Sequence, residues 1–123
     1  MDEQSRATLN TIEHFNAVFN RHDVDAVMAA FTEDCVFENT SPSPDGERYE
    51  GQTAVRAFWQ AFFDSSPSAV FETEDIFAAD DRCTVRWVYR WVDGSGVAGH
   101  VRGVDVFRVH DGKVAEKCAY VKG

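Results

Sequence analysis

Residues 101–121 read VRGVDVFRVHDGKVAEKCAYV, and their alternation of apolar and polar side chains predicts two β-strands joined by a tight turn. We expect the strands over 97–109 and 113–121, with His110, Asp111 and Gly112 forming a three-residue hairpin loop. The same period of two occurs earlier in the chain, over 70–78 and 83–92. The C-terminal half therefore predicts a meander of four antiparallel strands.

Apolar residues three and four positions apart predict three helices in the N-terminal half. We expect them over 7–20, from the N-cap Asp23 to Phe31, and from Gly51 to about Phe63. A short strand is predicted over Cys35–Asn39 and a proline-containing loop over 40–48. Helices followed by a strand meander predict an α+β fold, in one domain over residues 1–123.

The composition excludes several classes of partner. The chain has 21 acidic and 12 basic residues and a net charge of −9, which opposes binding to nucleic acid or to an anionic membrane surface. The polar N-terminus and the lack of a long apolar run predict a cytoplasmic protein. Cys35, Cys83 and Cys118 lie among apolar residues and read as buried free thiols. No cysteine or histidine spacing indicates a metal site.

The segment 83–92 separates its side chains into two unlike faces. Val85, Trp87, Tyr89 and Trp91 share one face, which we expect to point toward the helices. The other face mixes arginine and valine, as do the outward positions of the next strand. Because this outer face is partly apolar, we expect a homodimer formed through it.

A charged pair is predicted on the inner face of the last two strands. A three-residue loop places Asp105 directly across from Lys117, on the same face as Phe107. At the base of an apolar pocket, such a carboxylate can give or take a proton. If the face points outward instead, the two residues form an ordinary exposed pair worth at most about 1 kcal/mol. The pattern alone leaves both possibilities open, because both faces are partly apolar.

Three segments carry a resemblance to a known family: AFTEDCVFEN at 30–39, YEGQTAVRAFWQAFF at 49–63 and RGVDVFRVHDGKVAEKCAYVKG at 102–123. Together with the order of elements they resemble the SnoaL-like polyketide cyclase and ketosteroid isomerase group of the nuclear transport factor 2-like superfamily, over about residues 7–123. The resemblance implies a cone-shaped curved sheet packed on three helices around one small-molecule pocket. It also implies that Asp105 is a pocket carboxylic acid.

The chain departs from the isomerases of that group at three positions. The resemblance places Asn39 where their general-base aspartate lies and Phe15 where their oxyanion-binding tyrosine lies. Lys117 replaces a residue that is usually apolar. Steroid isomerisation by their mechanism is therefore not expected. Since a neighbouring cation favours the charged carboxylate, Asp105 suits a base better than an acid.

These observations predict a small hydrophobic ligand and no cofactor. We expect Asp105 as base, Lys117 as its electrostatic partner and Asn39 as a hydrogen-bond donor. Seven aromatic residues are expected to line the pocket: Phe15, Phe37, Trp59, Phe63, Trp87, Tyr89 and Phe107. The leading hypothesis is an isomerase, cyclase or dehydratase that acts on a small hydrophobic carbonyl compound. The alternatives are a non-catalytic ligand-binding domain and a dimeric interaction module whose own side chains fill the pocket.

Other titratable residues are weaker candidates. His14 borders the first apolar stripe and fits the surface better than a pocket mouth, and the other histidines, His22, His100 and His110, are expected in solvent. Glu38 becomes a candidate base only if a bulge shifts its strand. Asp75 joins the aromatic face in one register of the strand pair 70–78 and 83–92, which the sequence does not specify.

Overall fold

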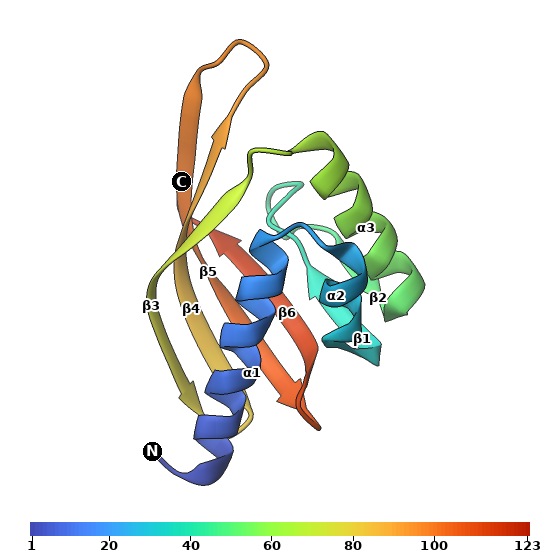
Figure 1. Ribbon diagram of the computed structural model, residues 1–123, viewed down its shortest axis with the longest axis vertical. Coiled ribbons are helices and arrows are strands. Elements are labelled where there is room, and N and C mark those ends of the chain that lie inside the picture. The colour runs from blue at the N-terminus through green and yellow to red at the C-terminus, as the bar shows by residue number, and fades with distance from the viewer.

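The computed structural model describes residues 1–123 and contains three helices and one six-stranded sheet (Figure 1). The elements are, in chain order, α1 (Glu3–Asn20), α2 (Val24–Ala29), β1 (Phe31–Glu38), β2 (Arg48–Glu50), α3 (Gly51–Ser65), β3 (Val70–Ala79), β4 (Arg82–Val92), β5 (Ala98–His110) and β6 (Lys113–Val121). The strand order is β2-β1-β6-β5-β4-β3, and all neighbours are antiparallel except β1 and β6. The predicted α+β class is confirmed.

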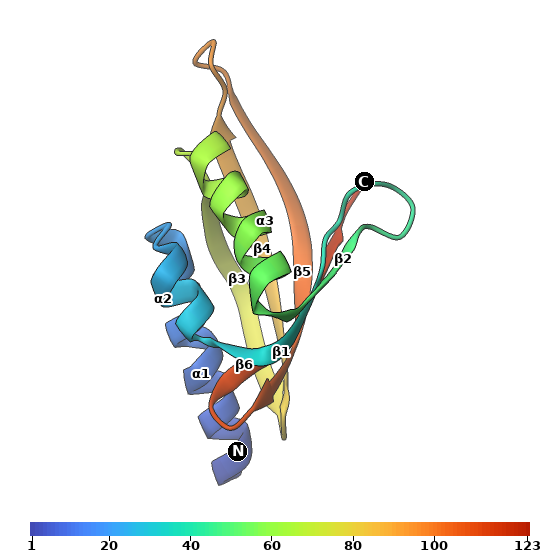
Figure 2. The same cartoon turned by 90° about the vertical axis from the view of Figure 1, so that its right-hand side faces the viewer.

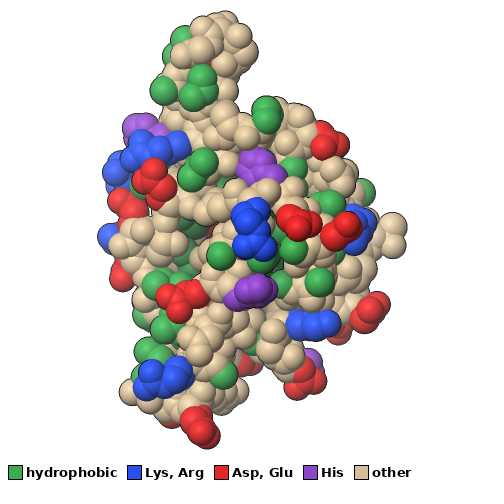
Figure 3. All heavy atoms as spheres, viewed as in Figure 1, with side chains coloured by type: hydrophobic (Ala, Val, Ile, Leu, Met, Phe, Trp, Pro, Cys, Tyr) green, Lys and Arg blue, Asp and Glu red, His purple; other side chains and the backbone are tan.

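The sheet curls around the helices, which lie on its concave side (Figures 1 and 2). One core of 18 buried side chains joins all three helices to the inner sheet face. The β4–β5 hairpin extends beyond this body and carries apolar side chains at its tip, where Val97 is 61% exposed (Figure 3). None of the helices has the length and apolarity that crossing a membrane requires. All three cysteines are buried and free, as predicted.

Local side-chain hydrogen bonds define where the first two helices begin. Asp2 accepts a hydrogen bond from the Ser5 amide at 2.7 Å, so α1 starts four residues before the predicted Ala7. Asp23 caps α2 in the same way, as predicted, through the Ala26 amide at 3.1 Å. Between them the chain turns at His22, whose φ is 57°.

The structure corrects the predicted elements around the first strand. β1 begins at Phe31, which the sequence pattern assigned to the second helix, and it ends at Glu38, before Asn39. The short strand β2 lies at the end of the segment predicted as a loop and pairs with β1, with Tyr49 across from Phe37. A strand of three residues is too short to show a recognisable alternation, so β2 could not be predicted without knowing that it pairs with β1.

The hairpin between β5 and β6 differs from the predicted one. Its loop has two residues, Asp111 and Gly112, both with positive φ (50° and 74°), as a type I′ turn requires. The shorter loop shifts the pairing by one residue, which would turn the side chains of β6 to the opposite face. A bulge next to Arg108 adds one residue to β6 and returns them to the expected face. Lys117 consequently lies across from Phe107 and Asp105 across from Ala119. The predicted direct opposition of Asp105 and Lys117 is wrong, whereas the prediction that they share a face is confirmed.

Two further expectations are corrected by local geometry. A bulge between Thr73 and Asp75 places Asp75 across from Arg86, so its exposed side chain does not join the aromatic face. His22 is half-buried rather than in solvent: its ring stacks on Phe63 with centroids 4.8 Å apart, and Nε2 lies 2.8 Å from the Ala69 carbonyl oxygen. The left-handed backbone at the corner turns this side chain inward.

Candidate active site

Asp105 and Lys117 form a buried ion pair on the concave face of the sheet. Lys117 Nζ donates to Asp105 Oδ1 at 3.0 Å, and the two side chains are only 8% and 7% exposed. The exposed cross-strand pair that the sequence left open is therefore excluded. Because removing two charges from water is costly, a buried ion pair contributes little net stability and calls for another explanation.

Aromatic rings surround the ammonium group of Lys117. Its Nζ lies 5.3–5.8 Å from four ring centroids, those of Phe19, Phe37, Trp59 and Phe107. Ring faces at this range attract a cation through their quadrupoles. The ammonium is thus held by one carboxylate and an apolar shell in which electrostatic interactions are stronger than in water.

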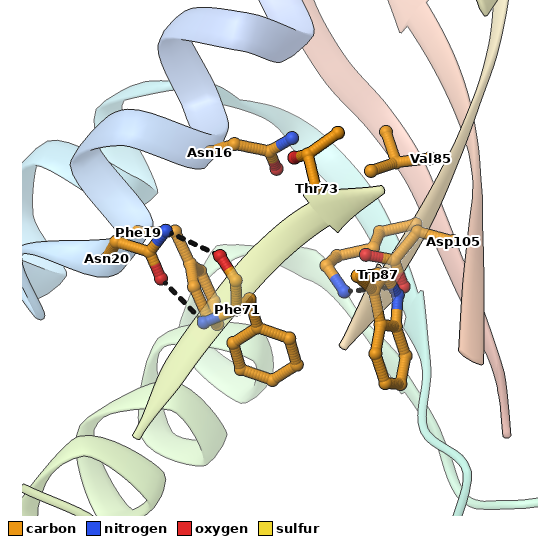
Figure 4. A pocket seen from close by; sticks show the side chains of 9 residues that line it. Asn16, Phe19, Asn20, Phe71, Thr73, Val85, Trp87 and Asp105 are labelled. Atoms are coloured by element: carbon orange, nitrogen blue, oxygen red, sulfur yellow. Dashed lines mark hydrogen bonds and ion pairs between the residues drawn. The ribbon is translucent and has the colours of Figure 1, made fainter. Parts of the chain in front are cut away.

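A small cavity adjoins the ion pair (Figure 4). Nine residues line it: Asn16, Phe19, Asn20, Phe71, Thr73, Val85, Trp87, Asp105 and Lys117. Its volume of about 20 Å³ suffices for one water molecule. A larger molecule can reach the ion pair only if wall side chains move.

Asn20 fixes one wall of the cavity. Its amide nitrogen donates to the Phe71 carbonyl oxygen at 2.9 Å, and its amide oxygen accepts from the Phe71 N–H at 3.0 Å (Figure 4). The side chain thereby replaces a neighbouring strand at the free edge of β3. This clamp holds the end of α1 against the strand that carries Phe71.

Trp87 forms another part of the wall and lacks a hydrogen-bond acceptor. Its side chain is buried and packs edge-on against Phe71, with ring centroids 5.3 Å apart and an interplanar angle of 82°. No protein atom accepts a hydrogen bond from its Nε1. The same holds for Trp59, which does not line the cavity.

The predicted site residues are only partly brought together. Of the seven predicted aromatic residues, Trp87 lines the cavity, while Phe37, Trp59 and Phe107 surround Lys117. Phe15 and Phe63 belong to the core, and Tyr89 stacks on Phe71 with centroids 4.5 Å apart.

Asn39 is not placed with the ion pair. It lies beyond the end of β1, where its Oδ1 accepts from the Thr40 amide at 2.8 Å and its backbone N–H donates to the Glu47 carbonyl at 2.9 Å. Asn39 is absent from the cavity wall. The neighbouring Glu38 pairs with Arg48 at 2.9 Å, which also keeps it away from the cavity.

Sequence reasoning missed the polar residues of the wall, Asn16, Asn20 and Thr73. A signal for two of them existed, since Asn16 and Asn20 are four residues apart and share one side of a helix. No group of three or more metal-binding side chains gathers in the structure.

Comparisons with known proteins identify the family and the fold. The family model for the SnoaL-like domain matches residues 12–117. The chain belongs to the SnoaL-like family. A solved NTF2-like protein of unknown function from Mesorhizobium loti is 41% identical to this SnoaL-like chain, with a TM-score of 0.84 over 100% of this chain and 97% of the other.

More distant structures share the fold. Bal32a, from a soil-derived mobile gene cassette, has 17% identity and a TM-score of 0.84 over 97% of this chain and 92% of its own. A protein from Xanthomonas campestris pv. campestris, provisionally described as a polyketide cyclase, has 23% identity and a TM-score of 0.79 over 98% and 93%. The comparison with curated proteins gave no match.

Proposed function

We propose that this SnoaL-like protein is a cofactor-independent acid/base enzyme that acts on a small hydrophobic carbonyl compound. The observation that carries the proposal is the buried Asp105–Lys117 pair at the wall of a cavity within an aromatic shell. The isomerase, cyclase and dehydratase reactions share one step, removal of a proton from a carbon next to a carbonyl group. The provisional description of the Xanthomonas structure as a polyketide cyclase supports the same class of substrate.

Asp105 is the base in this chemistry. Lys117 binds its Oδ1, and Oδ2 makes no hydrogen bond with the protein, so Oδ2 is free to take the proton. As the proton leaves, negative charge develops on the carbonyl oxygen, and Lys117 has two remaining N–H groups to stabilise it. The proposed chemistry omits Asn39, because its amide lies outside the cavity wall.

Substrate entry requires a change at the cavity wall, since about 20 Å³ holds only a water molecule. Phe71 is the large wall side chain best placed to move, because it is half-buried and belongs to the edge strand β3, whereas Phe19 and Trp87 are buried. Its outward rotation would join the cavity to the aromatic cluster with Tyr89 and Phe62.

Proton abstraction can be measured without knowing the natural substrate. The protein is incubated with cyclohexanone in D₂O, and NMR follows exchange of the protons next to the carbonyl. We expect catalysed exchange, lost at least about 100-fold in Asp105→Asn and retained in Glu33→Gln, an exposed carboxylate elsewhere. If Asp105→Asn is poorly folded, the double variant Asp105→Leu/Lys117→Met tests the same point. Unchanged exchange in these variants would overturn the role of Asp105.

The small cavity also favours a second candidate, a dimeric interaction module whose own side chains fill the pocket. On the outer sheet face Val104 is half-buried, directly across from Tyr120, which is 57% exposed. We propose that a second copy covers this face. Light scattering is expected to give the mass of a dimer for the wild type. Val104→Asp should dissociate the dimer, whereas the control Ala17→Asp, on the exposed side of α1, should leave it intact. A wild-type monomer would overturn the proposed dimer.

A further inference from the structure

We infer that the indole N–H of Trp87, together with the ammonium of Lys117, forms a binding site for an oxygen atom of the ligand. Trp87 is 5% exposed, and the protein supplies no acceptor for its Nε1. A buried donor without an acceptor is unfavourable, and buried polar groups nearly always have a partner. An acceptor for this N–H can come only from outside the chain.

We assign that acceptor to the cavity, because Trp87, Asp105 and Lys117 all line it. Figure 4 shows the nitrogen-bearing edge of the indole on the side of the Asp105 carboxylate. Lys117 uses one N–H on Asp105 and keeps two. An oxygen in the cavity thus meets two kinds of donor, one from β4 and one from β6, next to a carboxylate that can take a proton.

The volume of the cavity limits what can enter it. About 20 Å³ accommodates a single oxygen-sized group, which is one water in the free protein and one ligand oxygen in the complex. Two N–H donors favour an oxygen with lone pairs and partial or full negative charge. A carbonyl, enolate or carboxylate oxygen fits, with the apolar remainder of the ligand packed against the aromatic cluster around Phe71.

Packing holds the indole in one orientation. Gly103 is the direct partner of Trp87 across β4 and β5, and a Cβ at that position would lie 2.4 Å from the ring atom Cη2. Phe71 also packs against the indole, in an edge-to-face arrangement. A donor held in place before the ligand arrives stabilises developing charge without reorganisation.

Trp59 provides a comparison within the same protein. Its Nε1 is equally buried and equally without an acceptor, but Trp59 does not line the cavity. If the cavity is an oxygen site, a ligand affects the N–H of Trp87 and leaves that of Trp59 nearly unchanged. The assignment of a carbonyl or enolate ligand rests on the proposed function, whereas the binding measurement below does not require turnover.

The chain has three tryptophans, so ¹⁵N-labelled protein gives three indole signals, which single Trp→Phe variants assign. The probes are 4-nitrophenol, whose phenolate resembles an enolate, and acetate, which is smaller. We expect a saturable shift of the Trp87 signal and much smaller shifts of the other two. Trp87→Phe should weaken binding at least tenfold, and Trp91→Phe, which lies outside the cavity wall and the aromatic shell of Lys117, less than threefold. If Trp87→Phe misfolds, benzothienylalanine at position 87 removes the N–H and keeps the shape.

Three results would overturn the inference: no saturable shift with either probe, a Trp87 signal that stays in place while a probe binds, or equal affinities of the position 87 and position 91 variants. Failure of the proposed function looks different. In that case the Trp87 signal shifts as expected, but cyclohexanone shows no Asp105-dependent exchange.

Discussion

The ring of Trp87 lies over the backbone of Gly103, its direct partner across β4 and β5. A Cβ on Gly103 would lie 2.4 Å from the ring and 2.3 Å from the Tyr120 carbonyl oxygen. Trp91 and Gly99 repeat this pairing toward the tip of the hairpin, but there the three atoms nearest to an added Cβ all belong to the ring, the first at 2.5 Å. The glycines of GHVRG therefore make room for two indoles, one of which lines the cavity.

Gly103→Ala is expected to destabilise the protein by about 1–3 kcal/mol, because the new methyl group meets backbone and a buried ring, neither of which can move freely. Gly99→Ala should cost clearly less, because the half-buried Trp91 ring can swing outward. Urea denaturation measures the free energy of unfolding of both variants. Equal losses would show that the two indoles are held equally firmly.

Breaking the ion pair from one side is expected to be costly. Asp105→Asn or Lys117→Met leaves a buried charge without its counter-charge and should lower the free energy of unfolding by about 3–5 kcal/mol. Asp105→Leu/Lys117→Met should recover most of this loss, since an apolar pair needs no desolvation. As a control, removal of the exposed Arg56–Asp25 pair should cost less than about 1 kcal/mol. A double variant as unstable as the single ones would contradict this account.

The Asn20 clamp predicts a local effect on β3. Asn20→Ala removes two hydrogen bonds to Phe71, and at about 0.5–1.5 kcal/mol each it should lower stability and speed exchange of the Phe71 amide. Asn20→Asp keeps an acceptor for the Phe71 amide, so its stability and exchange rate should lie between those of the wild type and of Asn20→Ala. Asn10→Ala, on an exposed position of the same helix, is the control. Hydrogen exchange followed by NMR distinguishes a local effect at Phe71 from global unfolding.

Burial, together with the negative charges of Glu38 and Glu116, raises the pKa of Cys118 to about 11. At neutral pH the thiol is thus protonated and should react slowly with disulfide reagents. Glu116→Gln should lower the pKa of Cys118 and speed its modification relative to that of Cys83, which has neither carboxylate beside it. An unchanged ratio of the two rates would show that Glu116 does not act on this thiol.

Alkaline pH should destabilise the fold through the same thiols. Burial raises the pKa of Cys35, Cys83 and Cys118 from 9.0 to about 11. Between these values the unfolded chain has lost the thiol protons that the folded chain still holds. The contribution to stability is therefore complete below about pH 9 and is lost as the pH rises toward 11. Melting temperatures measured across this range should fall, and less so in Cys→Ala variants.

Part of the candidate site could be predicted from the strand pattern. Alternation in VDVFRV placed Asp105 and Phe107 on one face, and alternation in 83–92 placed Trp87 on the face toward the helices. The structure shows that these are the same buried face. The register was wrong, because a two-residue turn and a bulge replace the expected three-residue loop. The turn and the bulge each shift the pairing by one residue, so Lys117 stays on the same face. The residue directly across from it is Phe107 instead of Asp105.

The sequence by itself determined what depends on local periodicity and composition: the α+β class, the helical stripes, the cap at Asp23, the buried thiols and the faces of the strands. Only the tertiary structure decided where the bulges fall, that Asn39 lies apart from the ion pair, and that Asn20, Phe71 and Trp87 enclose one small cavity. The physical reason is distance along the chain. Periodicity reports which way a side chain points, whereas a cavity forms where side chains from α1, β3, β4, β5 and β6 fail to fill the space between them.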